Sequence, residues 1–289
     1  RVSKADFPTW ASQGNRRVMN ELVQNLLQIA AEAAVEVMDV YGQPFGVDYK
    51  GPADPVTDAD RRANDLICRR LAELYPDIPV VAEESPEELW QHYRASDRVF
   101  FVDPVDGTRE FVAKNDEFVI MIGLLEGDVP THGVLHAPAL KKRWAGAVGQ
   151  GAMQIDEDGT ETRLHLGDAP PIERARVVSS RSHRTSLLER ALEHLGAAEV
   201  LAIGSAGLKG AAIARGAADI YLAPEQAGCR WDSCAPEAII RAAGGVYTDA
   251  HGNRLDYRAA RLQNDRGIVA AAPSLHASVV ERMRGLLGE

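Results

Sequence analysis

Residues 100–108 have the sequence Phe-Phe-Val-Asp-Pro-Val-Asp-Gly-Thr, and the rest of the chain is best interpreted around this stretch. Its apolar first half predicts a short buried strand. Pro104 has no backbone N–H, which discourages a central strand from continuing past Asp103. Asp106 and Gly107 form a turn signal, after which free amides can open a helix that receives an anion. The stretch therefore offers carboxylates for a hard cation, amides for a phosphate and the hydroxyl of Thr108.

The bulk composition indicates an acidic protein with enough apolar residues for a substantial core. The 289 residues, of which 45% are hydrophobic, suit one large domain or two domains of ordinary size. The chain contains no run of about 18 apolar residues, so a transmembrane helix is not expected. The net charge of -10 argues against a broad nucleic-acid surface, which needs clustered lysine and arginine.

The cysteines point to a reducing location. Cys68, Cys229 and Cys234 form no CxxC pair, so we expect neither a zinc site nor a disulfide framework. A cytoplasmic location is the natural expectation. The first residues lack the apolar core of a signal peptide. Because the chain does not begin with Met, a trimmed leader stays open.

The first half of the chain combines two helices with a sheet. Apolar residues recur at helical spacing over 18–40, and Gly42 closes this helix. Thr57 and Asp60 have the spacing of a capping box at the start of a second helix, which Pro76 ends. We expect strands at 79–82, 99–102, 119–125, 133–136 and 143–148. This pattern predicts helices followed by a mostly antiparallel sheet.

After about residue 155 the pattern changes to alternating strands and helices. The expected strands lie at 177–179, 199–203, 219–222 and 245–248. The expected helices lie at 187–195, 207–215 and 232–243. We therefore predict two subdomains, 1–155 and 156–289.

Acidic residues stand where the predicted elements begin or end. They are Asp60, Glu83, Glu84, Asp103, Asp106 and Asp232. Taken singly, Asp60 and Asp232 suit ordinary helix caps, and the glutamate pair suits a solvated loop. Converging carboxylates repel one another, so a fold that gathers all of them needs a cation. Oxygen ligands suit Mg²⁺ or Mn²⁺ better than Zn²⁺, and such ions assist phosphate-ester hydrolysis.

These motifs resemble those of the inositol monophosphatase-like superfamily of lithium-sensitive, Mg²⁺-dependent phosphatases. The matching segments are TxxD at 57–60, the acidic pair at 82–85, DPxDGT at 103–108 and the WDxxAxE-like block at 231–237. The resemblance implies an α/β fold, an αβαβα sandwich of two subdomains with the site in the cleft between them. The first subdomain would carry most metal ligands, and the second would carry Asp232 and the substrate contacts.

Three segments resemble the 3'(2'),5'-bisphosphate nucleotidases more than the inositol phosphatases. They are 106–111, 180–183 and 228–237. Nucleotidases of this type remove the 3'-phosphate from 3'-phosphoadenosine 5'-phosphate. The resemblance therefore implies a small phosphate ester, an adenosine bisphosphate, as the partner, with no nucleic acid and no membrane. A homodimer is left open, because the sequence shows no interface.

The resemblance also implies a role for each acid. Two or three Mg²⁺ ions would be held by Glu83, Asp103, the Val105 carbonyl, Asp106 and Asp232. Asp60 would hold a weaker metal or its water. Thr108, together with Glu83 or Asp60, would orient and deprotonate the attacking water. The amides of Gly107 and Thr108 would hold the departing phosphate.

The substrate contacts leave an alternative open. Ser180 and His183 would meet the nucleotide, and Arg230 would contact the 5'-phosphate, since Arg matches phosphate geometry. Glu225 stands where inositol phosphatases place an acid that meets a sugar hydroxyl, so an inositol or sugar phosphate remains the alternative substrate. Lys50 either reaches the metal cluster or is solvated. A non-catalytic metal- or nucleotide-binding protein is disfavoured because every expected metal acid and Thr108 are present.

Overall fold

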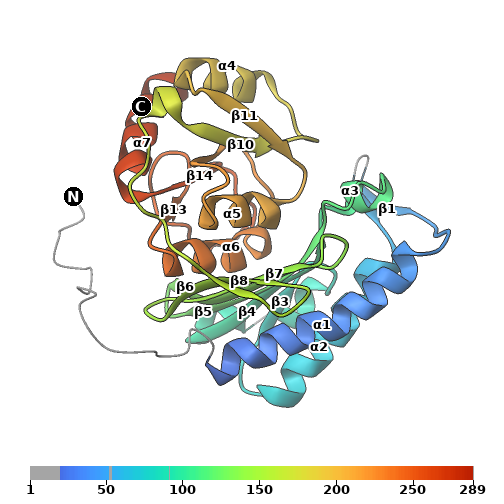
Figure 1. Cartoon of the computed structure of the whole chain (residues 1–289). Coiled ribbons are helices and arrows are strands. Elements are labelled where there is room, and N and C mark those ends of the chain that lie inside the picture. Colours follow the sequence, from blue (N-terminus) through green and yellow to red (C-terminus); the bar gives the residue numbers. More distant parts are fainter. Residues whose placement is uncertain (1–19, 52–53, 91, 289) are drawn as a thin grey trace.

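The computed structural model describes residues 20–51, 54–90 and 92–288. Val18, the first residue of the first expected helix, and the chain start lie outside the described residues. Two sheets and three helical layers alternate in the order αβαβα (Figure 1). The expected layered α/β sandwich is confirmed. Among the helices described here, none is both long and apolar enough to cross a membrane.

Helices α1 (Glu21–Tyr41) and α2 (Asp58–Leu74) cover the outer face of the larger sheet. Asn20 caps α1 by accepting a hydrogen bond from the Val23 amide at 2.9 Å. The capping box that we expected at Thr57 and Asp60 opens α2. Both helices pack their apolar sides on the sheet in one continuous core.

The larger sheet has seven strands in the order β3-β4-β5-β6-β7-β8-β9. Their bounds are Val80–Ala82, Arg98–Asp106, Val119–Glu126, Val129–Ala137, Lys142–Ala147, Gly151–Asp156 and Glu161–Leu164. Only β3 and β4 are parallel, so the mostly antiparallel sheet is confirmed. The boundary expected near residue 155 falls inside the β8–β9 hairpin, so a division by sheets would lie after Leu164.

Strand β4 corrects the expectation that Pro104 ends it. The strand continues to Asp106, and its register with β5 shifts between Asp103 and Asp106. A bulge is one of the few places where a strand tolerates a residue without an N–H. The Val105 amide donates to Asp103 Oδ1 at 2.9 Å, within the strand's own bulge. The bulge thus ends the regular ladder while carrying both carboxylates to the strand's end.

The smaller sheet has five strands in the order β11-β10-β12-β14-β13. Their bounds in chain order, β10 to β14, are Arg176–Ser180, Glu199–Ile203, Ile220–Ala223, Val246–Thr248 and Ile268–Ala271. Helices α4 (Ser186–Leu195) and α7 (Pro273–Leu287) cover its outer side. Helices α5 (Ala206–Ala214) and α6 (Trp231–Ala242) lie between the two sheets (Figure 1). The sequence had predicted neither β14 nor α7.

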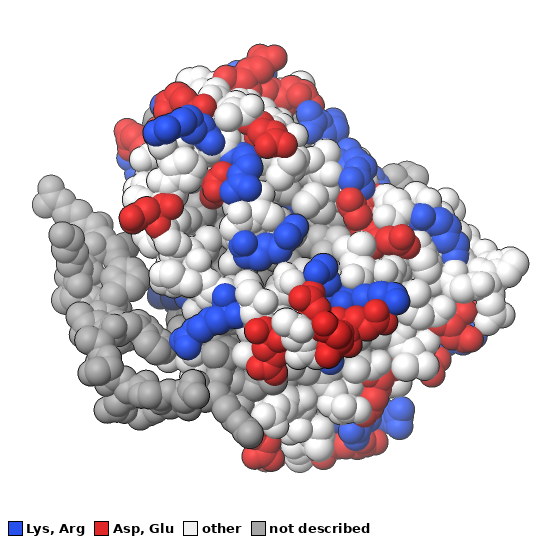
Figure 2. Space-filling model, in the orientation of Figure 1, with Lys and Arg blue, Asp and Glu red and all other residues white. Residues whose placement is uncertain are grey.

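Shorter elements complete the described chain. They are the hairpin strands β1 (Asp48–Gly51) and β2 (Asp54–Val56), the helix α3 (Thr108–Val112) and the 3-10 turns η2 (Glu87–Trp90), η3 (Tyr93–Ala95) and η4 (Ile172–Arg174). Figure 2 shows acidic and basic side chains interspersed over one face of the molecule. The acidic excess of the sequence is therefore not gathered into one patch on that face.

A row of glycines lets α6 lie directly on the larger sheet. Gly123, Gly133 and Gly146 are cross-strand neighbours on β5, β6 and β7. A Cβ on Gly123 would stand 2.6 Å from the Cys234 sulfur, and one on Gly133 would overlap the Ala235 carbonyl. Side chains here would push the helix away, so the row fixes the distance between α6 and the sheet.

We expect Gly133→Ala to lower the free energy of unfolding by about 1–3 kcal/mol, because the new methyl meets helix backbone rather than a flexible side chain. Urea unfolding measures the change. Gly285→Ala in α7 is the matched control, since no atom lies within 4 Å of its added Cβ. The control should match the wild type or gain up to about 1 kcal/mol. Equal stability of both variants would contradict the close packing of α6.

Candidate active site

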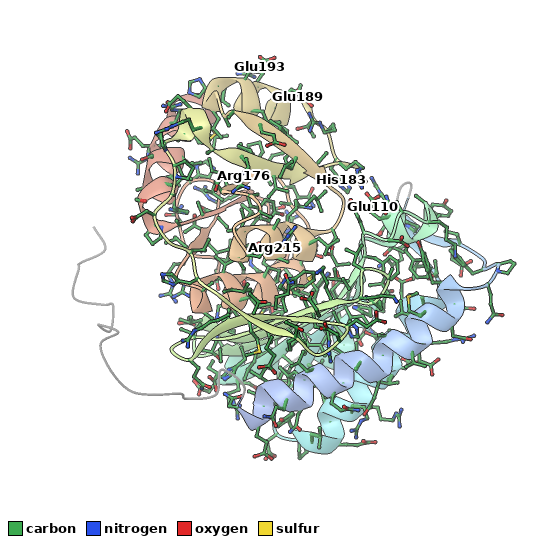
Figure 3. The ribbon with its side chains drawn as sticks, in the orientation of Figure 1. Glu110, Arg176, His183, Glu189, Glu193 and Arg215 are labelled. Carbon is green, nitrogen blue, oxygen red and sulfur yellow. The ribbon has the colours of Figure 1, made fainter. Side chains whose placement is uncertain are left out.

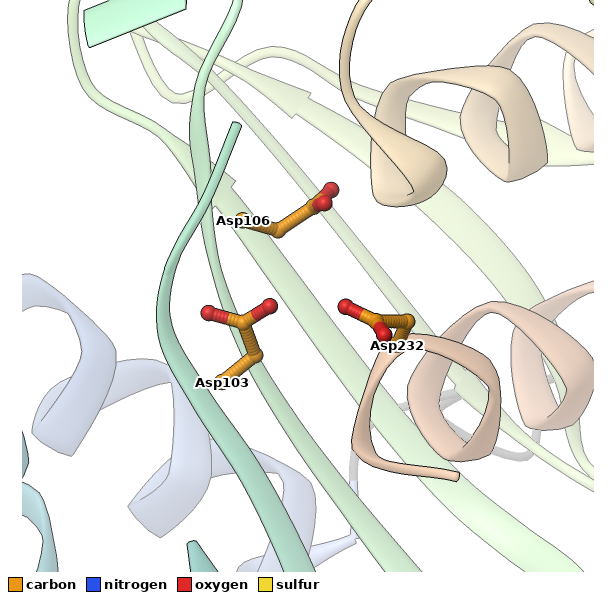
Figure 4. A group of neighbouring side chains, drawn as sticks. All are labelled: Asp103, Asp106 and Asp232. Carbon is orange, nitrogen blue, oxygen red and sulfur yellow. The ribbon is translucent and has the colours of Figure 1, made fainter. Parts of the chain in front are cut away.

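Three carboxylates converge where β4 ends and α6 begins. Asp103, Asp106 and Asp232 each place one oxygen within 4.8 Å of the others (Figure 4). Asp103 and Asp106 come from the bulged end of β4, and Asp232 comes from the first turn of α6. The structure thus brings together acids that stand more than a hundred positions apart in the sequence.

The electrostatics of the cluster fit a divalent cation. Burial raises the pKa of Asp103 well above its ordinary value, and the charges of Glu83, Asp232 and Asp106 raise it further. Burial and then the charge of Asp106 raise the pKa of Asp232 as well. A positive ion would offset both shifts, because its charge favours the ionised carboxylates and screens their mutual repulsion. The donors are all oxygen, which suits a hard cation.

Glu83 and Lys50 stand beside the cluster. The Lys50 ammonium lies 2.8 Å from Glu83 Oε1 and 2.7 Å from Glu84 Oε1. Burial raises the pKa of Glu83, and the charge of Lys50 works against that rise. Of the two alternatives for Lys50, the structure favours contact with the expected metal acids over a solvated side chain. Lys50 pairs with Glu83 and Glu84 and offsets part of their negative charge.

Asp60 serves as helix cap and as partner of Thr108. Its Oδ2 accepts hydrogen bonds from the Thr57 amide at 2.8 Å and the Thr57 hydroxyl at 2.7 Å. Its Oδ1 lies 3.1 Å from Thr108 Oγ1, which is also 3.1 Å from the Val105 carbonyl. The structure therefore pairs Thr108 with Asp60 rather than with Glu83. Burial raises the pKa of Asp60.

Helix α5 supports Asp106, a role that we had not predicted. The Ser205 hydroxyl donates to Asp106 Oδ2, and the Ala206 and Gly207 amides donate at 3.2 and 2.7 Å. Asp106 thus caps the N-terminus of α5, although α5 belongs to the second half of the chain and Asp106 to the first. Because the acid is remote in sequence, the only local signal was Ser205 as a helix N-cap.

Lys209, on the same helix, was also missed. Its ammonium is buried, donates to the Ser205 carbonyl at 2.9 Å and lines the cavity beside the cluster. Burial lowers the pKa of Lys209 to about 8, although the nearby Asp106 carboxylate opposes the shift. A lysine inside an otherwise apolar helical stretch was its only sequence signal.

The acids open into a cavity of about 590 Å³, a size that suits a small organic ligand. Gly107, Thr108 and Glu83 line the end near the cluster. The expected substrate residues Ser180, His183 and Glu225 line it elsewhere.

All three of these substrate residues are already hydrogen-bonded within the wall. The His183 amide donates to Ser180 Oγ at 3.1 Å, and the Thr185 hydroxyl donates to Glu225. The wall of the cavity is therefore held by its own contacts before any ligand enters.

Arg230 is not brought to the cavity. Its side chain is buried, and its guanidinium donates to the Asp256 carbonyl at 2.9 Å, to the Gln263 carbonyl at 3.2 Å and to the side chain of Asn264. These contacts tie the start of α6 to a remote loop. The structure therefore corrects the expected contact with a 5'-phosphate and gives Arg230 a supporting role.

The family model described as "Inositol monophosphatase family" matches residues 19–286. The chain belongs to the inositol monophosphatase family. Within this family it is similar to the 3'(2'),5'-bisphosphate nucleotidase CysQ of Salmonella typhimurium, with 37% identity over 82% of this chain and 94% of that protein. CysQ of Escherichia coli K12 is 36% identical over the same shares. The family expected from the motifs is confirmed.

Solved structures of the inositol monophosphatase family share the fold. CysQ from Bacteroides thetaiotaomicron has a TM-score of 0.72 and 28% identity, over 87% of this chain and 97% of that chain. The Thermotoga maritima inositol monophosphatase has a TM-score of 0.78 at 23% identity, over 93% and 98% of the two chains. The second likeness concerns the fold alone, so it does not choose between substrates.

Removing one acid tests the cluster as a cation site. We expect Mg²⁺, used as the probe cation, to raise the melting temperature of the wild type but not of Asp103→Asn. Without the ion the variant should be at least as stable as the wild type, because one of three repelling carboxylates is gone. Differential scanning calorimetry with and without Mg²⁺ measures both effects. The exposed Asp65→Asn is the control and should behave as the wild type. A full Mg²⁺-dependent rise in Asp103→Asn would contradict the assignment.

Proposed function

We propose that this chain is a Mg²⁺-dependent phosphomonoesterase that removes the 3'-phosphate from 3'-phosphoadenosine 5'-phosphate. The observation that carries the proposal is the similarity to nucleotidases named CysQ over most of the chain. The geometry supports it, since Asp106 and Asp232 of the acid cluster line the same cavity as Ser180 and His183.

The carboxylates would hold two or three Mg²⁺ ions. We assign Glu83, Asp103, the Val105 carbonyl, Asp106 and Asp232 as the ligands. Bound Mg²⁺ supplies positive charge opposite the phosphate and lowers the pKa of water. The raised pKa of Asp103 supports this assignment, because burial without a counter-charge disfavours its ionised form.

The pair of Thr108 and Asp60 would orient the attacking water. Thr108 Oγ1 lies 3.1 Å from both Asp60 Oδ1 and the Val105 carbonyl oxygen. When its single hydrogen points to Asp60, its lone pairs are free to accept a hydrogen bond from water, and the proton that water gives up would pass through this hydroxyl to Asp60. The water oxygen then directs a lone pair toward phosphorus. Because burial raises the pKa of Asp60, this carboxylate is a better proton acceptor than an exposed aspartate.

The backbone at Gly107 would hold the phosphate. Gly107 has φ +96°, a left-handed conformation that favours glycine, and an added Cβ would stand 2.7 Å from the Glu117 carbonyl. The following helix α3 has only five residues. We therefore attribute anion binding to the local amides of Gly107 and Thr108 rather than to a helix macrodipole.

The rest of the cavity would take the nucleoside and its second phosphate. Ser180 and His183 line one wall, and Lys209 presents a buried ammonium in place of the contact expected from Arg230. Glu225 also lines the cavity, which keeps an inositol or sugar phosphate as the second candidate substrate. A non-catalytic role is disfavoured by the intact pair of Thr108 and Asp60.

We also propose that the protein works in the cytoplasm. All three cysteines are free, which suits a reducing cytoplasm. A small nucleotide is the expected partner, and the homodimer that the family resemblance left open stays a prediction.

The proposed substrate can be tested against its alternatives directly. We expect kcat/KM for 3'-phosphoadenosine 5'-phosphate to exceed that for inositol 1-phosphate and fructose 1,6-bisphosphate by about a hundredfold, which is about 2.7 kcal/mol of transition-state binding. Phosphate release with Mg²⁺ measures all three. A preference for inositol 1-phosphate would favour the sugar-phosphate alternative. No release from any ester would favour a non-catalytic role.

The role of Thr108 can be tested with an isosteric change. We expect Thr108→Val to lower kcat by about 10²–10³-fold, because the hydroxyl that orients water is lost while the side-chain volume stays. Thr108→Ser keeps the hydroxyl and should stay within about tenfold of the wild type. Steady-state phosphate release measures both variants. Equal losses in both would point to packing rather than to the hydroxyl.

A further inference from the structure

Two of the segments that resemble those of the nucleotidases contact each other across the two halves of the molecule. Glu110 belongs to α3, and Ser182 follows β10. The Ser182 hydroxyl donates to Glu110 Oε1, and Arg109 Nη1 donates to the Ser182 carbonyl at 3.4 Å. Figure 3 shows Glu110 and His183 close together at the rim between the halves. The contact therefore joins the active-site turn to the wall that would meet the nucleotide.

Glu110 is a buried, hydrogen-bonded carboxylate. Only 4% of the residue is exposed. Ser182 and the Asn115 side chain donate to its two oxygens, and Arg181 Nη1 lies 3.6 Å from Oε2. Burial alone would raise the pKa of Glu110, but these hydrogen bonds and the Arg181 charge lower it below its ordinary value. A buried carboxylate is costly unless such donors are in place, so Glu110 favours the docked position of residues 181–182.

A second acid, Glu117, connects the 180–183 turn to the residues that precede α5. Arg181 donates to both oxygens of Glu117, at 2.5 and 2.7 Å. The Gly204 amide donates to Glu117 Oε2 at 2.9 Å, and the next residue, Ser205, donates to Asp106. The same network thus reaches from the 180–183 turn to a residue of the acid cluster.

Gly204 shows how closely this seam is packed. A Cβ at this position would overlap the carboxylate of Glu110. The residue has no left-handed φ, so its small size matters for the close approach and not for the backbone conformation. The carboxylate of Glu110 is therefore confined between α3, the 180–183 turn and the start of α5.

We propose that Glu110 is a positioning residue that sets the preference for a nucleotide by holding the 180–183 turn against the cavity. The turn is one hydrogen-bonded unit, since the His183 amide donates to Ser180 Oγ at 3.1 Å. Glu110 holds Ser182 in the middle of this unit, and Ser180, Ser182 and His183 all line the cavity, as does Glu110 itself. This inference rests on the proposed function, because it assigns the turn to the nucleotide.

The test is Glu110→Gln in the full chain with Mg²⁺. We expect KM for 3'-phosphoadenosine 5'-phosphate to rise by about tenfold or more, the effect of losing one charge-assisted hydrogen bond, with a smaller change in kcat. The ratio of kcat/KM for the nucleotide to kcat/KM for inositol 1-phosphate should fall by a similar factor. A rise in KM for the nucleotide alone indicates that Glu110 positions the turn. Loss of a catalytic group would instead lower kcat for both esters.

A matched variant controls for the loss of a buried carboxylate. Glu237 on α6 is also buried and accepts a hydrogen bond from the Tyr257 hydroxyl at 2.8 Å, but it does not line the cavity. Glu237→Gln should leave the ratio of the two kcat/KM values unchanged, whatever it does to stability. A second test is Ser182→Ala, alone and combined with Glu110→Gln. If Glu110 acts through Ser182, the double variant should lose little more than either single one.

The outcomes separate this inference from the proposed function. A wild-type preference for the nucleotide that Glu110→Gln leaves intact would overturn the inference alone. A wild type without that preference would refute the proposed function and the inference with it. If Glu110→Gln does not fold, Ser182→Ala decides, since it keeps the carboxylate. An unchanged nucleotide KM in Ser182→Ala would overturn the inference, and a rise of about tenfold would support it.

Discussion

Direct contact between α6 and the backbone of the larger sheet is the constraint on which the site depends. Gly123, Gly133 and Gly146 form one row across three strands, and side chains there would collide with the helix. The close approach brings the first turn of α6 to the end of β4, so Asp232 meets Asp103. A site built this way cannot tolerate a small shift between its halves, because interiors are close-packed and transmit such shifts.

Placing these carboxylates close together and away from water is unfavourable, and the surrounding groups offset only part of that free-energy cost. Burial raises the pKa of Asp103 and Asp232, so the ionised form of each is less favourable than in an exposed aspartate. Lys50 pairs with Glu83, and the start of α5 donates to Asp106, yet Asp103 has no such cationic partner among the described residues. Active sites commonly retain such unfavourable arrangements because the function needs them.

Local signals were sufficient for much of the fold and for the acids, and long-range packing decided the rest. The capping box of Thr57 and Asp60 and the WD turn at Asp232 depend on neighbours in the sequence, which is why the pattern predicted their places. The bulge at Pro104 depends on pairing with β5, and the direction of Arg230 depends on a loop 26 to 34 residues away. Strand β14 is four apolar residues long, too short for periodicity to separate strand from helix.

Under the proposed function, chemistry and substrate choice lie on different parts of the chain. The three clustered aspartates come from β4 and from α6, which the glycine row holds against the sheet, whereas Ser180 and His183 come from a turn after β10. Turns at the ends of parallel strands can change without disturbing the sheet that positions them. Solved structures with different names, a CysQ and an inositol monophosphatase, can therefore share one fold. Such a turn needs a fixed place in the wall of the cavity, and in this chain the buried carboxylate of Glu110 on α3 holds it through Ser182.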